Sequence, residues 1–229
     1  MLKYSVNKRF LGVIVDKQTV RQILSILKSE YPNAKTVLNY ESNYQLLVAV
    51  ILSAQCTDER VNKVTAVLFK DYPTPEKMLM LTNEELAKII RPVGLFNSKA
   101  THILQATSDI VNKFNGEVPS DFESLISLAG VGRKTADVML AVAFFDDAIA
   151  VDTHVFRVSN RIGLANATTP YKTELQLMKI IDKDKWSFSH HLILWHGRKV
   201  CKARSPKCDD CKIKEYCKYY KKVQKNDNR

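Results

Sequence analysis

The amino-acid sequence predicts an all-α fold, and three observations point to it. Apolar residues recur at helical spacing in about ten segments. No segment shows a convincing alternation of period two, which is the pattern of a half-buried strand. Glycine and proline together account for 14 of the 229 residues, about 6% against an ordinary share near 12%. A chain with so few turn-forming residues suits long helices better than a many-stranded barrel or sandwich.

The expected helices begin at residues that cap a helix or follow a turn. In chain order, their starts are expected near Asp16, Leu46, Thr57, Thr82, Ser98, Ser120, Arg133, Asp152, Tyr171 and Phe188. Thr82 with Glu85, and Ser120 with Glu123, have the spacing of capping boxes. The helix that begins at Arg133 is expected to end near Phe145. Three other helix ends are marked by glycine, at Gly94, Gly116 and Gly163.

Two segments are expected to depart from this pattern. Ala148 to Val151 is expected to form one buried turn of strand, and the tail after Cys217 is expected to be disordered. We find no repeat, no low-complexity segment and no Gly/Ser-rich linker in the sequence. The first fifteen residues receive no assignment.

The composition favours a globular protein that crosses no membrane. Hydrophobic residues make up 45% of the chain, which is enough for a sizeable core. The longest unbroken apolar run has eight residues, from Val138 to Phe145, whereas a membrane-spanning helix needs about twenty. The apolar stretch around Phe10 to Val15 is too short for a secretory signal. We therefore expect a cytoplasmic protein, associated with the nucleoid if it is bacterial.

The excess of positive charge lies at the C-terminal end. The net charge is +11, and the 32 residues from Arg198 to Arg229 contain 12 Lys and Arg against 4 Asp and Glu. A basic end on a near-neutral body predicts a polyanionic partner, either nucleic acid or an anionic membrane. The membrane is disfavoured because no helix pairs a lysine-rich face with bulky apolar residues. A solvated tail is the alternative, although the cysteines in this stretch indicate that part of it is folded.

Four of the five cysteines form the pattern C-x6-C-x2-C-x5-C: Cys201, Cys208, Cys211 and Cys217. Disulfides are not expected in a cytoplasmic chain, and soft thiolates select zinc or an iron–sulfur cluster. The common all-cysteine zinc site has two C-x2-C pairs, whereas this loop has one, so the wider gaps favour a [4Fe–4S] cluster. Basic side chains that would offset the negative charge of a cluster are Lys199, Lys202, Arg204, Lys207 and Lys212. The fifth cysteine, Cys56, is expected in the core.

A glycine hairpin precedes a basic pair. Gly130 and Gly132 flank the apolar Val131, and Arg133 and Lys134 follow directly. Glycines let the backbone turn sharply and leave N–H groups facing outward, which suits a DNA phosphate at the start of the next helix. Such binding would not depend on base sequence. A plain turn between two helices is the alternative.

Lys134 and Asp152 are candidates for chemistry. Lys134 falls in the first turn of a helix beside Arg133, and both the helix dipole and this neighbour disfavour an ammonium ion. A neutral amine can attack a carbon and form a Schiff base. Asp152 would stabilise positive charge that develops at a sugar carbon. An ordinary surface lysine and a simple helix cap are the alternatives, and the residues alone do not decide between these interpretations.

Six segments together make the sequence similar to a known family. They are LLVAVILSAQCTDERVNK (46–63), VGLFNSKA (93–100), NGEVPSD (115–121), LAGVGRKTADV (128–138), AVDTHVFRVSNRIG (150–163) and the cysteine segment (196–217). In this order and spacing they resemble the endonuclease III family of DNA glycosylase/AP lyases, in the helix–hairpin–helix superfamily. The resemblance covers roughly Asp16 to Tyr219. One departure is Ala129, where the family usually has a proline that would stiffen the hairpin entry.

The resemblance implies two helical lobes with a DNA-binding cleft between them. One lobe is a six-helix barrel over about residues 36–146 that contains the hairpin. The other joins residues 1–35 to residues 147–229 and carries a [4Fe–4S] cluster on the four cysteines. By the same likeness, Lys134 matches the nucleophilic lysine of the family and Asp152 its catalytic aspartate.

The resemblance also implies a set of DNA contacts. Gln55 would fill the space left by an extruded base, and Leu95 would wedge into the opposite strand. By the same likeness, Gly130, Val131 and Gly132 would hold a phosphate. From their positions in the sequence alone, Arg133 beside the hairpin and Lys202 and Arg204 beside the cysteines are also expected to contact phosphates.

The activity implied is that of a bifunctional DNA N-glycosylase and AP lyase of base excision repair. Such an enzyme removes oxidised pyrimidines and cuts the strand 3′ of the abasic site by β-elimination, through a Schiff base on Lys134. Its partner would be double-stranded DNA with damaged bases or abasic sites, and we expect it to act as a monomer. The alternatives are a mismatch-specific or other monofunctional glycosylase, and a non-catalytic helix–hairpin–helix DNA-binding protein. Lysine at 134 favours the bifunctional enzyme, because other members of the superfamily lack it.

Overall fold

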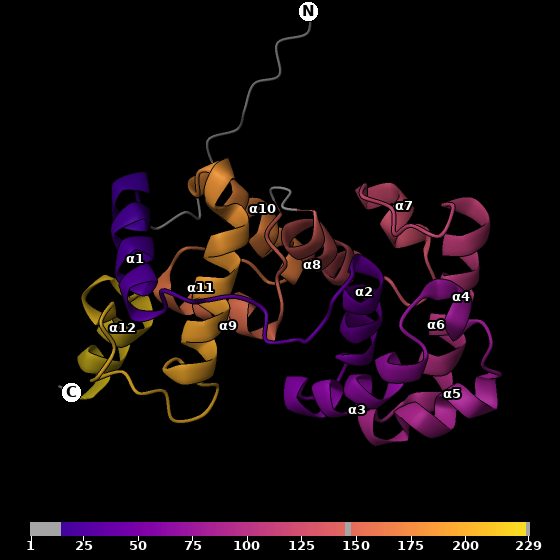
Figure 1. The fold of residues 1–229 in the computed structure, drawn as a ribbon. Coiled ribbons are helices and arrows are strands. Elements are labelled where there is room, and N and C mark those ends of the chain that lie inside the picture. The colour runs from indigo at the N-terminus through magenta and orange to yellow at the C-terminus, as the bar shows by residue number, and fades with distance from the viewer. Residues whose placement is uncertain (1–14, 145–147, 228–229) are drawn as a thin grey trace, which may run out of the picture. The chain divides into compact units, whose positions relative to one another are not determined.

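All regular structure is helical within residues 15–144 and 148–227, the part of the chain that the computed structural model describes (Figure 1). The predicted all-α fold is thereby confirmed. The chain forms two compact units: a central unit, Thr36–Ala148, and a terminal unit that joins Met1–Lys35 to Ile149–Arg229. None of the described helices is long and apolar enough to cross a membrane.

The central unit is built around one enclosed helix, α2. Its α-helices are Asn43–Leu52 (α2), Asp58–Asp71 (α3), Pro75–Met78 (α4), Asn83–Ile90 (α5), Phe96–Lys113 (α6), Phe122–Ser127 (α7) and Arg133–Ala143 (α8), with a 3-10 turn at Arg91–Val93 (η1). Every residue of α2 from Tyr44 to Leu52 is buried, and α2 packs against α3, α6 and α8. The run of seven apolar residues in the sequence therefore marks a helix that is enclosed on all sides.

The terminal unit combines the first described helix with the four C-terminal α-helices. Its α-helices are Lys17–Glu30 (α1), Thr153–Ile162 (α9), Pro170–Ile180 (α10), Trp186–Lys199 (α11) and Lys218–Asp227 (α12), with 3-10 turns at Lys183–Lys185 (η2) and Lys214–Tyr216 (η3). α9 packs against α10, α11 and α12, and α1 packs against α11. The amphipathic α1 contributes four buried residues to this core: Val20, Ile23, Leu24 and Leu27.

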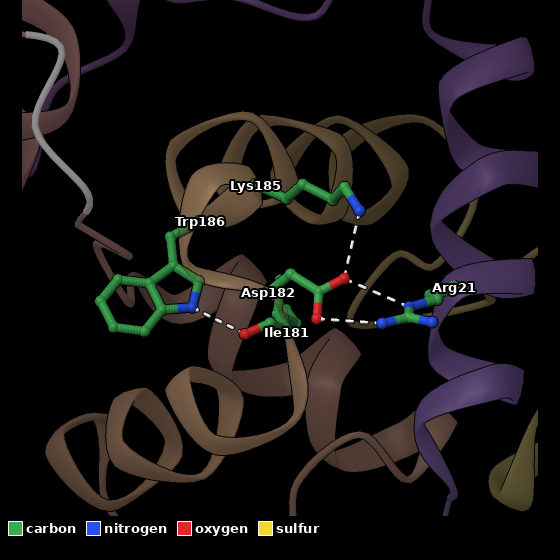
Figure 2. A network of polar contacts seen from close by, with 5 residues as sticks. All are labelled: Arg21, Ile181, Asp182, Lys185 and Trp186. Carbon is green, nitrogen blue, oxygen red and sulfur yellow. Dashed lines mark hydrogen bonds and ion pairs between the residues drawn. The ribbon is translucent and has the colours of Figure 1, made fainter.

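Polar contacts hold α1 against the segment between α10 and α11, as Figure 2 shows. The guanidinium of Arg21 donates to both oxygens of Asp182, at 3.2 and 3.3 Å, and the Nζ of Lys185 donates to Oδ2 at 3.1 Å. These two cations lower the pKa of the Asp182 carboxyl. In the same turn, the indole N–H of Trp186 donates to the carbonyl of Ile181 at 3.0 Å. The network thus joins positions that are 161 residues apart in the sequence.

Several predicted helix starts are confirmed, and others are shifted. The buried helix predicted from Leu46 begins at Asn43, and the helices predicted from Tyr171 and Phe188 begin one and two residues earlier. Asp16 caps α1, and Thr82 with Glu85 forms the capping box of α5. The capping box predicted at Ser120 is wrong, because α7 is capped by Asp121, whose Oδ1 accepts from the N–H of Ser124 at 2.9 Å. Aspartate caps as well as serine and lies one residue closer to the helix. The long helix α6 begins at Phe96 rather than Ser98, with Leu95 as its cap, and the short helix α4 has no counterpart in the prediction.

Two predictions for irregular segments are wrong. Residues 148–151 are buried but form no strand, because the carbonyl of Ala150 contacts the Nδ1 of His190 at 2.6 Å and has no neighbouring strand among the described residues. The tail from Lys218 to Asp227 is helical rather than disordered, since α12 packs on α9 and the guanidinium of Arg161 lies 4.7 Å from the ring centroid of Tyr219. The expected helix end near Phe145 and the boundary between residues 146 and 147 lie outside the described residues.

Candidate functional site

The hairpin between α7 and α8 uses its two glycines for different reasons. Gly130 has φ +75°, and a Cβ there would lie 2.9 Å from the Cβ of His102. Val131 is buried and its N–H donates to the carbonyl of Leu128 at 3.1 Å, so the apolar residue anchors the turn. Gly132 is the N-cap residue of α8, and no side chain caps the first turn. A helix that starts without a side-chain cap is a ready site for an anion such as phosphate.

We expect alanine at Gly130 mainly to lower the stability of the protein, and alanine at Gly132 mainly to weaken its binding to DNA. Gly130→Ala strains a left-handed backbone and brings its Cβ against His102, so the free energy of unfolding should fall by about 1–2 kcal/mol. At Gly132 an added Cβ meets nothing within 4 Å. Gly132→Ala should therefore lower stability by less than about 1 kcal/mol, through the poorer N-cap, yet weaken duplex DNA binding about tenfold by holding a phosphate off the backbone.

Thermal unfolding and fluorescence anisotropy with a labelled duplex measure the two effects separately. Gly132→Ala that binds the duplex as tightly as the wild type would contradict a phosphate site at the hairpin backbone. Equal stability of Gly130→Ala and the wild type would contradict the steric role of Gly130.

Lys134 lies at the surface, one residue into α8. Its side chain and that of Arg133 are both exposed in the first turn of this helix. The guanidinium of Arg133 lies 4.6 Å from the ring centroid of Phe122, which keeps one cation beside the hairpin. What distinguishes Lys134 from the other exposed lysines is therefore its position, directly after the Gly130–Gly132 turn and open to a macromolecular ligand.

Asp152 caps α9 with only one of its carboxylate oxygens. The backbone N–H groups of His154 and Val155 both donate to Oδ1, each at 2.8 Å. Oδ2 has no hydrogen bond to any described residue, and the side chain is half-buried. The cap therefore orients the carboxylate and leaves one oxygen available for another role. Asp152 belongs to the terminal unit and Lys134 to the central unit.

The two residues expected to probe the duplex share an unusual backbone conformation. Gln55 has φ +55° and Leu95 has φ +50°, in the left-handed region that residues with a Cβ rarely adopt. Both are exposed, and Leu95 keeps 57% of its surface accessible despite being apolar. Strained and exposed residues of this kind concentrate at functional sites. Nothing in the sequence signals the conformation of either residue.

The four cysteines of the segment 201–217, here called the cysteine loop, line a single cavity together with Val200, Pro206, Lys207, Lys214, Tyr219 and Tyr220. Burial raises the pKa of the Cys211 thiol to about 11, and it raises those of Cys208 and Cys217 as well. Such thiols become thiolates only beside positive charge, which a metal centre supplies.

The four thiols of the cysteine loop are a candidate donor set for a metal centre. Bonds of about 2.3 Å around one zinc ion would hold the sulfurs within about 4 Å of one another. In the described part of the chain, no three His, Cys, Asp or Glu side chains are close enough to hold one metal ion. The four thiols that line one cavity are a donor set that fits a [4Fe–4S] cluster.

Two arginines of α9, which the sequence did not indicate, hold the cysteine loop. Arg157 donates to the carbonyls of Gly197 and Cys201, each at 3.1 Å. Arg161 donates to the carbonyl of Lys202 at 2.7 Å and its Nη1 lies 3.6 Å from the Sγ of Cys201. A pair of arginines four residues apart on one helix face is the signal that could have revealed them. Lys202 and Arg204, expected at DNA, are exposed on the same loop.

A buried histidine contacts another cysteine of the loop. The Nε2 of His196 lies 3.6 Å from the Sγ of Cys211, and its Nδ1 lies 3.2 Å from the hydroxyl of Tyr31. Burial lowers the pKa of His196 to about 4 and raises that of Tyr31 to about 12. At neutral pH the imidazole is therefore uncharged and the phenol keeps its proton. With a thiolate at Cys211, the consistent arrangement has Tyr31 donating to Nδ1 and Nε2–H donating to sulfur.

Known proteins resemble this chain over nearly its whole length. A family model described as HhH-GPD superfamily base excision DNA repair protein matches residues 48–183. A second, the iron-sulfur binding domain of endonuclease III, matches residues 201–217, which contain the cysteine loop. The endonuclease III of Rickettsia conorii is 52% identical over 203 residues, which cover 89% of this chain and 97% of the relative.

Solved structures agree with these matches. A trapped endonuclease III–DNA covalent intermediate has a TM-score of 0.88 at 44% identity and covers 92% of this chain and 100% of that one. A thermostable thymine-DNA glycosylase has a TM-score of 0.79 at 26% identity and covers 90% of this chain and 98% of that one.

Proposed function

From the premise that the chain belongs to the endonuclease III family of the HhH-GPD superfamily, we propose that it is a bifunctional DNA N-glycosylase and AP lyase for oxidised pyrimidines. Membership establishes the coarser activity: the protein is a DNA glycosylase of base excision repair, and its partner is DNA. Its cofactor is a [4Fe–4S] cluster, and the donor set that fits the cluster is the four cysteines of the cysteine loop. The lyase step and the lesion are the proposal.

The observation that carries the lyase activity is an exposed amine, that of Lys134, directly after the phosphate-binding turn. A damaged base must leave the stack before it can be removed, at a cost of a few kcal/mol. The Nζ of Lys134 then attacks the sugar C1′, the glycosidic bond breaks, and the base departs with a proton. The C1′–O4′ bond of the sugar ring then opens, O4′ takes a proton, and the nitrogen forms an imine with C1′. The imine acidifies the C2′–H, and loss of that proton expels the 3′ phosphate group by cleavage of the C3′–O3′ bond. One lysine thus serves both the glycosylase and the lyase step.

Asp152 supports this chemistry through the oxygen that the helix cap does not use. A carboxylate near C1′ stabilises the positive charge that develops as the glycosidic bond breaks. Because the N–H groups of His154 and Val155 hold Oδ1, the carboxylate is oriented before substrate arrives. Preorganisation of this kind requires no reordering in the transition state.

Affinity comes from phosphate contacts that carry no sequence information. We propose that the hairpin, Arg133 and the loop residues Lys202 and Arg204 bind phosphates, while Gln55 and Leu95 enter the duplex. Binding should therefore weaken steeply with salt. The cluster, when bound, cross-links the cysteine loop and so fixes the positions of Lys202 and Arg204. We propose that the protein acts as a monomer on chromosomal DNA, in the cytoplasm at the nucleoid.

A panel of duplexes tests the proposed activity with the wild-type holoenzyme. We expect excision and strand cleavage of thymine glycol and oxidised cytosine, without heat or alkali treatment. Cleavage that appears only after alkali would indicate a monofunctional glycosylase. Action on a G·T mismatch alone would favour the second candidate, a mismatch-specific glycosylase, to which the thymine-DNA glycosylase fold gives some support. Binding without turnover of any lesion would contradict both enzymes.

A further inference from the structure

Lys99 is a buried lysine whose ammonium group is fully engaged with backbone carbonyls. The side chain belongs to α6 and is 4% exposed. Its Nζ donates to the carbonyls of Leu52, Ala54 and Val93 at 2.9, 2.8 and 3.1 Å. An ammonium group has three donors, so these three bonds use all of them. Burial lowers the pKa of Lys99, and the carbonyls compensate for the loss of hydration.

The three carbonyls belong to two separate turns. Leu52 is the last residue of α2, and Ala54 precedes Gln55 directly. Val93 ends η1, two residues before Leu95. Carbonyls at helix ends lack intrahelical partners and favour a cation. Lys99 therefore bonds both the turn that carries Gln55 and the turn that carries Leu95.

The main chain of the same residue also fixes the second turn. The N–H of Lys99 donates to the carbonyl of Leu95 at 3.0 Å, and the Oγ of Ser98 donates to the same carbonyl at 3.0 Å. Gln55 and Leu95 both hold left-handed backbone, which persists only where the surroundings enforce it. Lys99 thus makes hydrogen bonds to both strained turns at once.

We propose that Lys99 is a positioning residue that fastens the Gln55 turn and the Leu95 turn to each other, so that both side chains enter the duplex as one preformed unit. The inference rests on the proposed function, in which these two residues probe DNA. A pair of probes held in advance pays less ordering entropy when the duplex opens.

The first test measures hydrogen exchange in the holoenzyme without DNA. Lys99→Met keeps the length of the side chain and removes its three donors. Exchange in the segments 52–56 and 93–96 should become at least about tenfold faster, with the rest of the chain unchanged. The matched control is Lys113→Met on the same helix, whose ammonium is exposed and pairs with Asp109 at 2.8 Å. Unchanged exchange in both segments would overturn the proposal.

The second test is a double-mutant cycle of Lys99→Met and Leu95→Ala. For each variant, kcat/KM for excision from a thymine glycol duplex is measured under single-turnover conditions. Lys99→Met should lower kcat/KM about tenfold. Leu95→Ala should cost less in the Lys99→Met background than in the wild type, because the leucine is already misplaced. Full additivity would overturn the proposal. If Lys99→Met fails to fold, Lys99→Gln, which retains two N–H donors, should show the same effects at smaller size.

The two levels of failure are distinguishable. A wild-type holoenzyme that neither cleaves lesions nor forms a borohydride-trapped adduct contradicts the proposed function, whereas faster exchange in both segments of Lys99→Met still supports the shared hold on the two turns. An active enzyme that is unaffected by Gln55→Ala and by Leu95→Ala overturns the positioning role.

Discussion

Lys134→Ala is expected to abolish the borohydride-trapped adduct with an abasic duplex and to lower single-turnover excision of thymine glycol by at least about 10³-fold. The reason is chemical, because alanine supplies no nitrogen for the bond to C1′. Lys134 is exposed and lies at a helix start without a side-chain cap. Its removal should therefore change the free energy of unfolding by no more than about 0.5 kcal/mol.

The control for this variant is another exposed lysine of the central unit. Lys88→Ala, in the last turn of α5, removes the same charge at a position outside the proposed site. It should trap at the wild-type level. Normal trapping by Lys134→Ala would show that another amine is the nucleophile. If Lys134→Ala lost affinity for the duplex by the same factor as it lost excision activity, Lys134 would be a phosphate contact and not the nucleophile.

Local signals in the sequence were enough for most helix starts. The Thr82–Glu85 capping box and the Asp16 cap involve residues three apart, so the pattern is read within one turn. The prediction of a disordered tail was wrong for the opposite reason. Its helix α12 is stabilised by Tyr219 under the guanidinium of Arg161, a contact between residues far apart in the sequence that no local propensity contains.

In the candidate site, too, features formed by residues close in the sequence could be predicted, and contacts between distant residues could not. The hairpin could be predicted because Gly130 and Gly132 are only two positions apart in the sequence, and the cofactor could be predicted because its four thiols lie within one loop. The contacts that support these features could not be predicted from the sequence. Lys99 reaches carbonyls up to 47 residues away, and Tyr31 meets His196 across 165 residues. Such pairs become visible only when packing has placed the helices.

Asp152→Asn is expected to keep the stability of the protein and to lose most of its activity. Asparagine caps a helix as well as aspartate, because its amide oxygen can accept from the N–H groups of His154 and Val155. Loss of the negative charge at the helix start costs at most about 1 kcal/mol. Single-turnover excision should nevertheless fall by about 10²–10³-fold, since no carboxylate remains to stabilise the charge at C1′.

The comparison with Asp152→Ala separates the two roles of this residue. Alanine removes the cap as well, so thermal unfolding should show a further loss of about 1 kcal/mol with little additional loss of activity. Asp121→Asn makes the same chemical change at the cap of α7 and should leave excision unchanged. If Asp152→Asn instead excises thymine glycol at the wild-type rate, the carboxylate is only a cap. Another group of the protein would then have to stabilise the positive charge that develops at C1′.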